Sequence, residues 1–123
     1  MYAQTATSEE DALRRALADS NNSPQGYIRE LEAFLHQYPQ TARRPEVENL
    51  LFRSALSLKD LGRVATYGEE ILAREPDNKV ALENVTAAEL KLAKPSDLTR
   101  ALAHAHHLEQ LGAAAPPPHG AGT

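Results

Sequence analysis

Apolar side chains recur at spacings of three and four residues along most of the chain, and short breaks divide this pattern into six stretches. Such spacing places the apolar side chains on one face of an α-helix. Proline or asparagine marks most of the breaks, at Asn21–Pro24, Pro39, Pro76 and Lys94–Pro95. The sequence therefore predicts six amphipathic helices joined by short loops, which would pair as three antiparallel hairpins.

The amino-acid composition also favours helices over sheets. The 123 residues include 21 alanines and 17 leucines, but only 4 valines and 2 isoleucines. Alanine and leucine are strong helix formers, whereas β-branched residues are the ones that strands prefer. The length suits one domain of an all-α class.

Charge and cysteine content exclude several classes of function. The chain has 17 acidic and 13 basic side chains and a net charge of −4, which argues against a nucleic-acid-binding surface. It has no cysteine, so disulfides and thiolate metal sites are excluded. No stretch approaches the roughly 18 apolar residues of a membrane span.

We expect order mainly between residues 8 and 111. Residues 1–7 are small and polar and predict a disordered N-terminus, in which the small residues around Ala3 also fit the remnant of a cleaved signal. Residues 112–123 are rich in Ala, Gly and Pro and predict a flexible tail or linker. A signal remnant would favour the periplasm and the lack of cysteine the cytoplasm, so both compartments stay open.

The segment Pro45–Asn78 is 34 residues long and contains two of the helical stretches. Leu51 and Ala55 carry the apolar pattern of the first, Gly68 allows close packing of the second, and Pro76 ends the unit. In these features the segment resembles a tetratricopeptide repeat (TPR), a helix–turn–helix unit of 34 residues. Three positions depart from the family pattern, namely Glu48, Phe52 and Lys59.

Residues 8–40 and 79–112 resemble two more degenerate copies, the last with about three extra residues around Lys94–Pro95. The resemblance thus covers residues 8–112 and implies an all-α right-handed superhelix of three hairpins over residues 8–111. A plain helical bundle is the alternative. The expected core consists of Leu17, Leu31, Phe34, Leu51, Ala55, Val64, Ile71, Val85, Leu90, Ala101, Leu102 and Leu108.

In such a stack the first helices of the hairpins line a concave groove. The resemblance therefore implies a peptide-binding groove formed by Asn49, Leu50, Arg53, Ser57, Glu83, Asn84, Ala87 and Lys91. It also assigns to the groove Glu46, Val80, Glu9, Ala12, Leu13 and Ala16. Asparagine amides can bond a peptide backbone, and Arg53 and Lys91 can bind carboxylates. Some TPR proteins clamp a C-terminal carboxylate, but only Asn84 matches a position of that clamp.

The residues show no catalytic constellation, so we expect neither an enzyme nor a cofactor. His104 and His107 share a helix face and could bind a metal, but a zinc site needs a third ligand that no sequence motif supplies. We therefore place these histidines, with Arg100 and Glu109, on a solvent face that closes the last helix. The carboxylate pairs Glu9–Glu10 and Glu69–Glu70 are interpreted as solvated charge.

The predicted function is protein–protein interaction, with an unidentified protein or peptide bound in the groove. A structural spacer or dimerisation segment of a larger protein is the alternative, and a histidine-based metal enzyme is the least favoured one. Because apolar residues of 80–92 spread over more than one side of their helix, we also expect weak self-association, or docking of a downstream segment, through the third hairpin.

Overall fold

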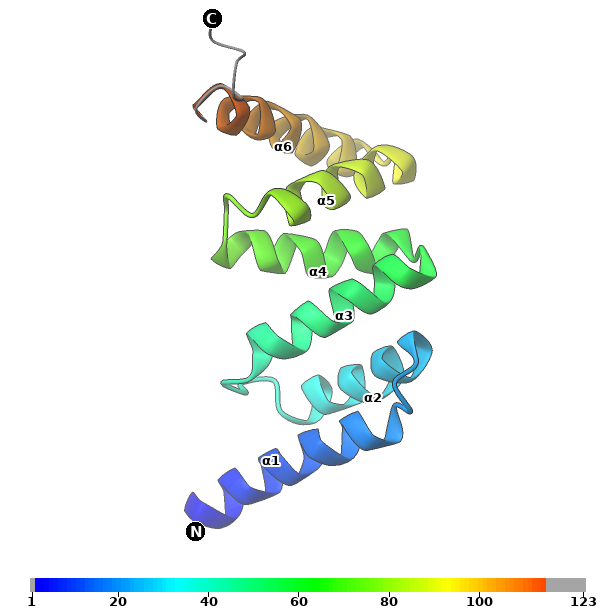
Figure 1. Cartoon of the computed structure of the whole chain (residues 1–123), viewed down its shortest axis with the longest axis vertical. Helices are drawn as coiled ribbons and strands as arrows, with labels where there is room; N and C mark the ends of the chain where they lie inside the picture. Colours follow the sequence, from blue (N-terminus) through cyan, green and yellow to red (C-terminus); the bar gives the residue numbers. More distant parts are fainter. Residues whose placement is uncertain (1, 115–123) are drawn as a thin grey trace, which may run out of the picture.

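The computed structural model describes residues 2–114, which form six α-helices and no strand. The all-α prediction is therefore confirmed for this part of the chain. The helices follow one another with short connections (Figure 1). In chain order they are α1 (Tyr2–Asp19), α2 (Pro24–Gln37), α3 (Arg44–Leu58), α4 (Leu61–Arg74), α5 (Lys79–Leu92) and α6 (Pro95–Ala114).

The six helices form an extended stack in which each lies against its neighbours in sequence (Figure 1). Within residues 2–114, the backbone contacts between helices all join consecutive helices. A closed bundle would also bring together helices that are distant in sequence. The arrangement is therefore linear, as in repeat proteins whose units touch only the next unit.

Side-chain caps define the start of three helices. Ser23 accepts a hydrogen bond from the backbone N–H of Gly26, Asp60 accepts one from Arg63, and Asn78 accepts one from Ala81. These side chains satisfy backbone donors that the first helical turn leaves without an acceptor.

The α3–α4 and α5–α6 connections end their first helices in the same way. Lys59 and Ala93 both adopt the left-handed conformation, at φ 57°, and donate their backbone N–H groups to Ala55 and Glu89. Ala55 and Glu89 thus occupy equivalent positions of α3 and α5.

Equivalent positions of α2 and α4 are farther apart in sequence than the predicted 34-residue unit. The N-caps Ser23 and Asp60 have the same offset as the prolines Pro39 and Pro76 that follow the helices. The unit from α2 to α4 is thus longer by about one helical turn than a TPR unit, whereas the C-caps Lys59 and Ala93 are 34 residues apart.

The apolar faces form two core clusters that meet at α3. Val47 and Leu51 of α3 pack with α1 and α2, whereas Phe52 and Ala55 of α3 pack with α4 and α5. Tyr67 of α4 packs against both clusters. The predicted core residues that are buried are Leu31, Phe34, Leu51, Ala55, Val64, Ile71, Val85 and Ala101, with Leu17 and Leu108 half-buried.

Two predicted core residues are wrong. Leu90 of α5 is 55% exposed and Leu102 of α6 is 74% exposed. The periodicity marks both as apolar, but Leu90 lies on the same side of α5 as the exposed Glu83 and Ala87, and the described chain has no helix beyond α6 that could cover Leu102. Leu98, which shares a face of α6 with Leu102, is also exposed.

The chain ends also differ from the sequence predictions. Helix α1 begins at Tyr2, whereas the sequence predicts a disordered segment 1–7. Helix α6 continues to Ala114, so residues 112–114 of the predicted tail are helical. The rest of the predicted tail, residues 115–123, lies outside the described residues. Among residues 2–114, every helix is too short or too polar to cross a membrane.

Replacing Leu51 by alanine should destabilise the chain by about 2–5 kcal/mol, because Leu51 is fully buried and its loss leaves a cavity. The matched control is Leu102→Ala, which should change the free energy of unfolding by less than about 0.5 kcal/mol. Urea unfolding followed by circular dichroism measures both. Equal effects of the two substitutions would contradict the packing described here.

We predict weak self-association through the third hairpin, because it exposes Leu90, Leu98 and Leu102. Sedimentation velocity at rising concentration should show an increasing average mass, which Leu98→Gln/Leu102→Gln should reduce. A strict monomer at high micromolar concentration, without binding of a dye for apolar surfaces, would contradict this prediction.

Candidate functional site

Three hollows lie along α3 and α5 and share lining residues, so that they form one continuous groove. Arg53 lines both the first and the second hollow, and Leu56 lines both the second and the third. The hollows have volumes of about 290, 290 and 330 Å³. We call the three together the α3–α5 groove.

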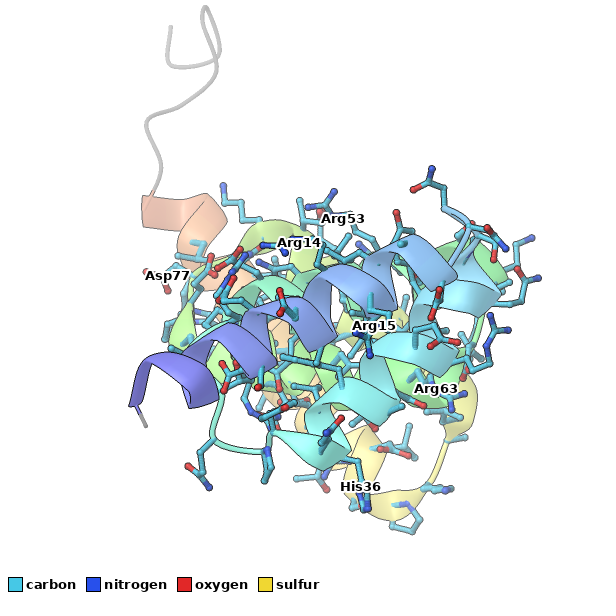
Figure 2. All side chains as sticks on the ribbon, turned by 90° about the horizontal axis from the view of Figure 1, so that it is seen from below. Arg14, Arg15, His36, Arg53, Arg63 and Asp77 are labelled. Atoms are coloured by element: carbon cyan, nitrogen blue, oxygen red, sulfur yellow. The ribbon has the colours of Figure 1, made fainter. Side chains whose placement is uncertain are left out.

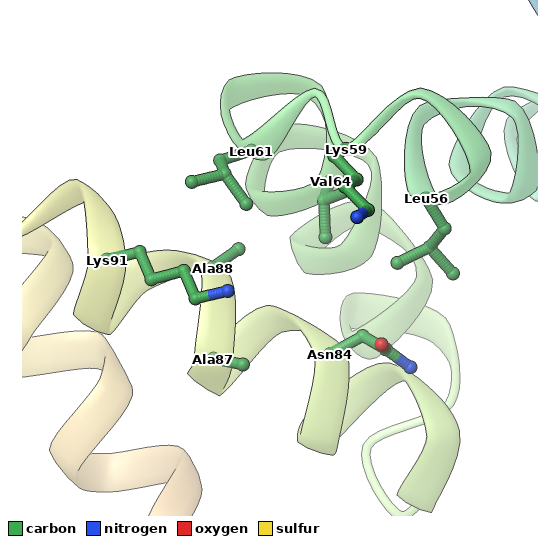
Figure 3. A pocket seen from close by; sticks show the side chains of 8 residues that line it. All are labelled: Leu56, Lys59, Leu61, Val64, Asn84, Ala87, Ala88 and Lys91. Atoms are coloured by element: carbon green, nitrogen blue, oxygen red, sulfur yellow. The ribbon is translucent and has the colours of Figure 1, made fainter.

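Helix α3 contributes side chains to all three hollows. Residues of the α1–α2 connection and of α2 complete the first hollow, through Asn22, Pro24 and Tyr27. The α4–α5 connection and the start of α5 complete the second, through Asn78, Val80 and Ala81. The α3–α4 connection and the middle of α5 complete the third (Figure 3).

The structure brings together most of the residues that the sequence assigns to a groove. Leu50, Arg53 and Ser57 line the first hollow, Asn49 and Arg53 the second, and Asn84, Ala87 and Lys91 the third. Val80 is 60% exposed and lines the second. Glu83 is exposed and lines none of these three hollows.

The positions assigned from the first hairpin lie elsewhere. Leu13 is buried in the core, and Ala12 and Ala16 line a separate hollow between α1 and α2. Glu9 accepts a hydrogen bond from the Thr41 hydroxyl.

Glu46, at the start of α3, also stands apart from the groove. It forms an ion pair with Arg43, and this guanidinium lowers the pKa of Glu46. The groove is therefore formed mainly by the second and third hairpins.

The third hollow combines an apolar floor with two amino groups. Leu56, Leu61, Val64 and Ala88 supply apolar surface. The side chains of Lys59 and Lys91 extend into the space between the α3–α4 turn and α5 (Figure 3).

The charges that line the α3–α5 groove are all positive. They belong to Arg53, Lys59 and Lys91, and no acidic side chain lines any of the three hollows. Among the described residues, none of these three cations forms an ion pair within 4 Å, whereas seven other arginines do. The groove is thus a cationic strip in a chain whose net charge is −4.

The asparagines of the groove differ in what they can offer a ligand. The Asn84 side-chain amide donates to the Val80 carbonyl oxygen, at 2.8 Å. Asn78 is engaged as the N-cap of α5.

Arg53 projects from one side of the stack, and His36 of α2 lies on the opposite side when the stack is seen along its long axis (Figure 2).

The solvent face predicted for α6 is exposed at Arg100 and Glu109, but the prediction is wrong for the two histidines, which are half-buried against α4 and the α4–α5 connection. His104 Nε2 lies 2.7 Å from Glu69 Oε2 of α4, and His107 Nε2 lies 2.8 Å from Asp77 Oδ1. Arg100 donates through Nε to Glu89 Oε2 of α5, at 3.1 Å. The reason is helical phase, because a residue three after Ala101 and four before Leu108 lies on the same face as both.

A second polar cluster therefore lies between α4, α5 and α6. It contains Glu69, Glu89 and His104, whose oxygen and nitrogen atoms lie within 4.8 Å of one another. Glu89 is fully buried. Glu69 is half-buried and paired with His104, so it is not the solvated charge that the sequence suggested. Burial, together with the neighbouring Glu69, raises the pKa of Glu89. The signal in the sequence was a carboxylate inside the apolar pattern of residues 80–92.

A related polar network joins α2 to α4. Arg63 donates to both oxygens of Glu32, at 2.7 and 2.9 Å, and to Asp60 at 2.8 Å. The Tyr67 hydroxyl donates to Glu32 as well. The Arg63 guanidinium holds the pKa values of Glu32 and Asp60 below their ordinary range, and burial raises the pKa of Tyr67.

Comparisons with protein-family models, with curated proteins and with solved structures found no match for this chain. Its function must therefore be inferred from the geometry of these sites.

The Arg63 network predicts a specific dependence of stability on pH. The pKa values of Glu32 and Asp60 are lower in the folded than in the unfolded chain. The network therefore stabilises the fold above the ordinary glutamate pKa of 4.5, and this contribution is lost as the pH falls through the folded values. Arg63→Gln should lower the melting temperature at neutral pH and flatten its decline in acid.

Thermal unfolding followed by circular dichroism between neutral pH and about pH 3 tests this prediction. The control is Arg14→Gln, which removes an exposed pair with Asp11 and should leave the profile unchanged. An acid decline as steep in Arg63→Gln as in the wild type would show that the network does not contribute.

Proposed function

We propose that this chain is a non-catalytic protein-interaction module of TPR-like design, which binds an acidic peptide segment along the α3–α5 groove. The right-handed superhelix is part of this proposal. The observation that carries it is that every charged side chain lining the three connected hollows is positively charged.

Charge complementarity supports an acidic ligand. Arg53, Lys59 and Lys91 have no acidic partner within the described chain, so carboxylates of a ligand would not have to displace one. Opposite charges steer association and select among partners. The guanidinium of Arg53 can bind a carboxylate through two parallel hydrogen bonds.

The apolar floor of the third hollow supports an amphipathic segment. Leu56, Leu61 and Val64 offer surface to an apolar side chain, while the two lysines stand at its rim. An acidic segment with interspersed apolar residues fits this combination better than a purely acidic one, because interfaces gain most of their affinity from a few buried anchors.

A structural spacer or dimerisation segment is the second candidate function. The observation that favours it is the exposure of Leu90, Leu98 and Leu102 on the third hairpin. This surface and the cationic groove involve different residues, so the two functions do not exclude each other.

Selection from a displayed library of random peptides tests the groove. The full chain should select peptides enriched in Asp and Glu with one or two large apolar residues. Binding to the Arg53→Gln/Lys91→Gln variant should weaken by at least about tenfold, since each lost charged contact is worth about 1.5–3 kcal/mol. It should also weaken with rising salt.

The matched control is Arg14→Gln/Arg29→Gln, which changes the net charge equally but removes cations outside the groove. This variant should bind the selected peptides as the wild type does. Equal losses in both variants, or selected peptides without acidic enrichment, would refute the proposed site.

A further inference from the structure

The polar network between α4 and α6 repeats the one between α2 and α4. Four residues of the first network have counterparts at one constant offset in the sequence. These pairs are Glu32 and Glu69, Asp60 and Asp97, Arg63 and Arg100, and Tyr67 and His104. In both networks the arginine bonds the aspartate three residues before it, and the last residue bonds the glutamate of the preceding even-numbered helix.

Two substitutions distinguish the second network from the first. An imidazole, His104, stands where the first network has the Tyr67 phenol. A carboxylate, Glu89, stands on α5 at the position that Ala55 occupies on α3. Ala55 and Glu89 are both fully buried, whereas His104 is half-buried. The second network therefore contains two glutamates and a histidine where the first has one glutamate and a tyrosine.

Glu89 is incompletely satisfied by the protein. Its Oε2 accepts from Arg100 Nε, at 3.1 Å, but its Oε1 has no hydrogen-bond partner and lies 3.9 Å from His104 Nε2. Glu48, another buried carboxylate, accepts at both oxygens from Arg44 and Arg74. A buried oxygen without a partner is costly, so Oε1 needs either a proton that Glu89 shares with Glu69 or a cation that takes the place of that proton.

We propose that Glu69, Glu89 and His104 bind one divalent transition-metal ion of the zinc type, with water in the remaining position. The three ligands come from three consecutive helices, and their donor atoms lie within 4.8 Å of one another. Three protein ligands and a water are a common arrangement for Zn²⁺. The mixed nitrogen and oxygen donors favour Zn²⁺ over Ca²⁺ or Mg²⁺, which prefer more numerous oxygen ligands.

Arg100 is the cation that competes with this metal. Its Nε lies 3.1 Å from Glu89 Oε2 and 3.7 Å from Glu69 Oε2. The side chain is 46% exposed and also bonds Asp97, so it can turn toward Asp97 and leave the two glutamates to the metal. A hollow of about 240 Å³, lined by Glu69, Asp97 and Arg100 among others, gives access to the cluster from solvent.

Metal binding would fasten α6 to α4 and α5. In a linear stack, α6 has backbone contacts with one neighbour in sequence only, and a shared ion would strengthen the link to α4 that the His104–Glu69 contact already makes. The proposal does not depend on what the α3–α5 groove binds, because that groove shares no residue with the cluster.

Calorimetric titration of the full chain with Zn²⁺, at about pH 8 so that the ligands are more fully deprotonated, tests the site. We expect one ion per chain and a higher melting temperature, reversed by a chelator. Glu89→Gln and His104→Gln should each weaken binding by at least about 100-fold, since even outer partners of metal ligands contribute 10–100-fold. His107→Gln, which alters the neighbouring His107–Asp77 contact, should bind like the wild type.

Arg100→Gln separates a metal site from a purely structural cluster. If the site binds a metal, removal of the competing guanidinium should tighten Zn²⁺ binding. If Arg100 is the only cation that the glutamates accept, the variant should bind no Zn²⁺. Circular dichroism confirms that each variant is folded. Should a ligand variant fail to fold, nuclear magnetic resonance of the wild-type imidazoles decides, because Zn²⁺ should shift His104 and leave His36 unchanged. No binding by the wild type, or binding that His107→Gln removes and Glu89→Gln does not, would overturn the proposal.

Discussion

Burial of each helix by its neighbours in sequence is the constraint on which this structure depends. Backbone contacts within residues 2–114 join consecutive helices only. Stability is then a sum of interfaces between adjacent helices, and no long-range closure compensates for a weak one. This explains why polar networks from α2 to α4 and from α4 to α6 are useful: they add side-chain links between helices that are not consecutive.

The same constraint creates the surfaces that can bind a ligand. A helix in a linear stack has a neighbour on two sides and solvent on the others, so the groove along α3 and α5 stays accessible along its length. Helix α6 has a neighbour on one side only, which leaves Leu98 and Leu102 exposed. The accessible groove and the exposed leucines of α6 thus have the same cause, which is that each helix is covered only by its neighbours in sequence.

The sequence predicted the parts of the fold that depend on local pattern. Leu31, Leu51, Val64 and Ile71 are buried as expected, because a stripe at spacings of three and four residues must face a neighbour wherever helices pack on both sides. Most residues assigned to the groove also lie together, since their phase on α3 and α5 is opposite to that of the core. Pattern and phase were sufficient for the core, whereas the groove residues were assigned from the resemblance to TPR units.

The sequence could not predict features that depend on which neighbours exist. Leu102 has the same chemistry as a core leucine and is exposed only because nothing described packs beyond α6. The sequence analysis placed His104 on a solvent face, although a residue three after Ala101 and four before Leu108 shares their buried face. Glu89 interrupts an apolar stripe, but its burial depends on the approach of Glu69 and Arg100 from two other helices. A contact among side chains from three different helices cannot be recognised from the sequence pattern of any one helix.

The constant offset between the two polar networks has a consequence for the length of the array. Counted on from Glu69, the same offset leads to His106, which lies exposed on α6. A further hairpin stacked on α6 would therefore meet an imidazole where α2 and α4 each present a carboxylate to the next arginine. A neutral or positively charged ring cannot accept a guanidinium as a carboxylate does. Within the described residues, α6 therefore offers no carboxylate at the position from which Glu32 and Glu69 bind an arginine of the next even-numbered helix.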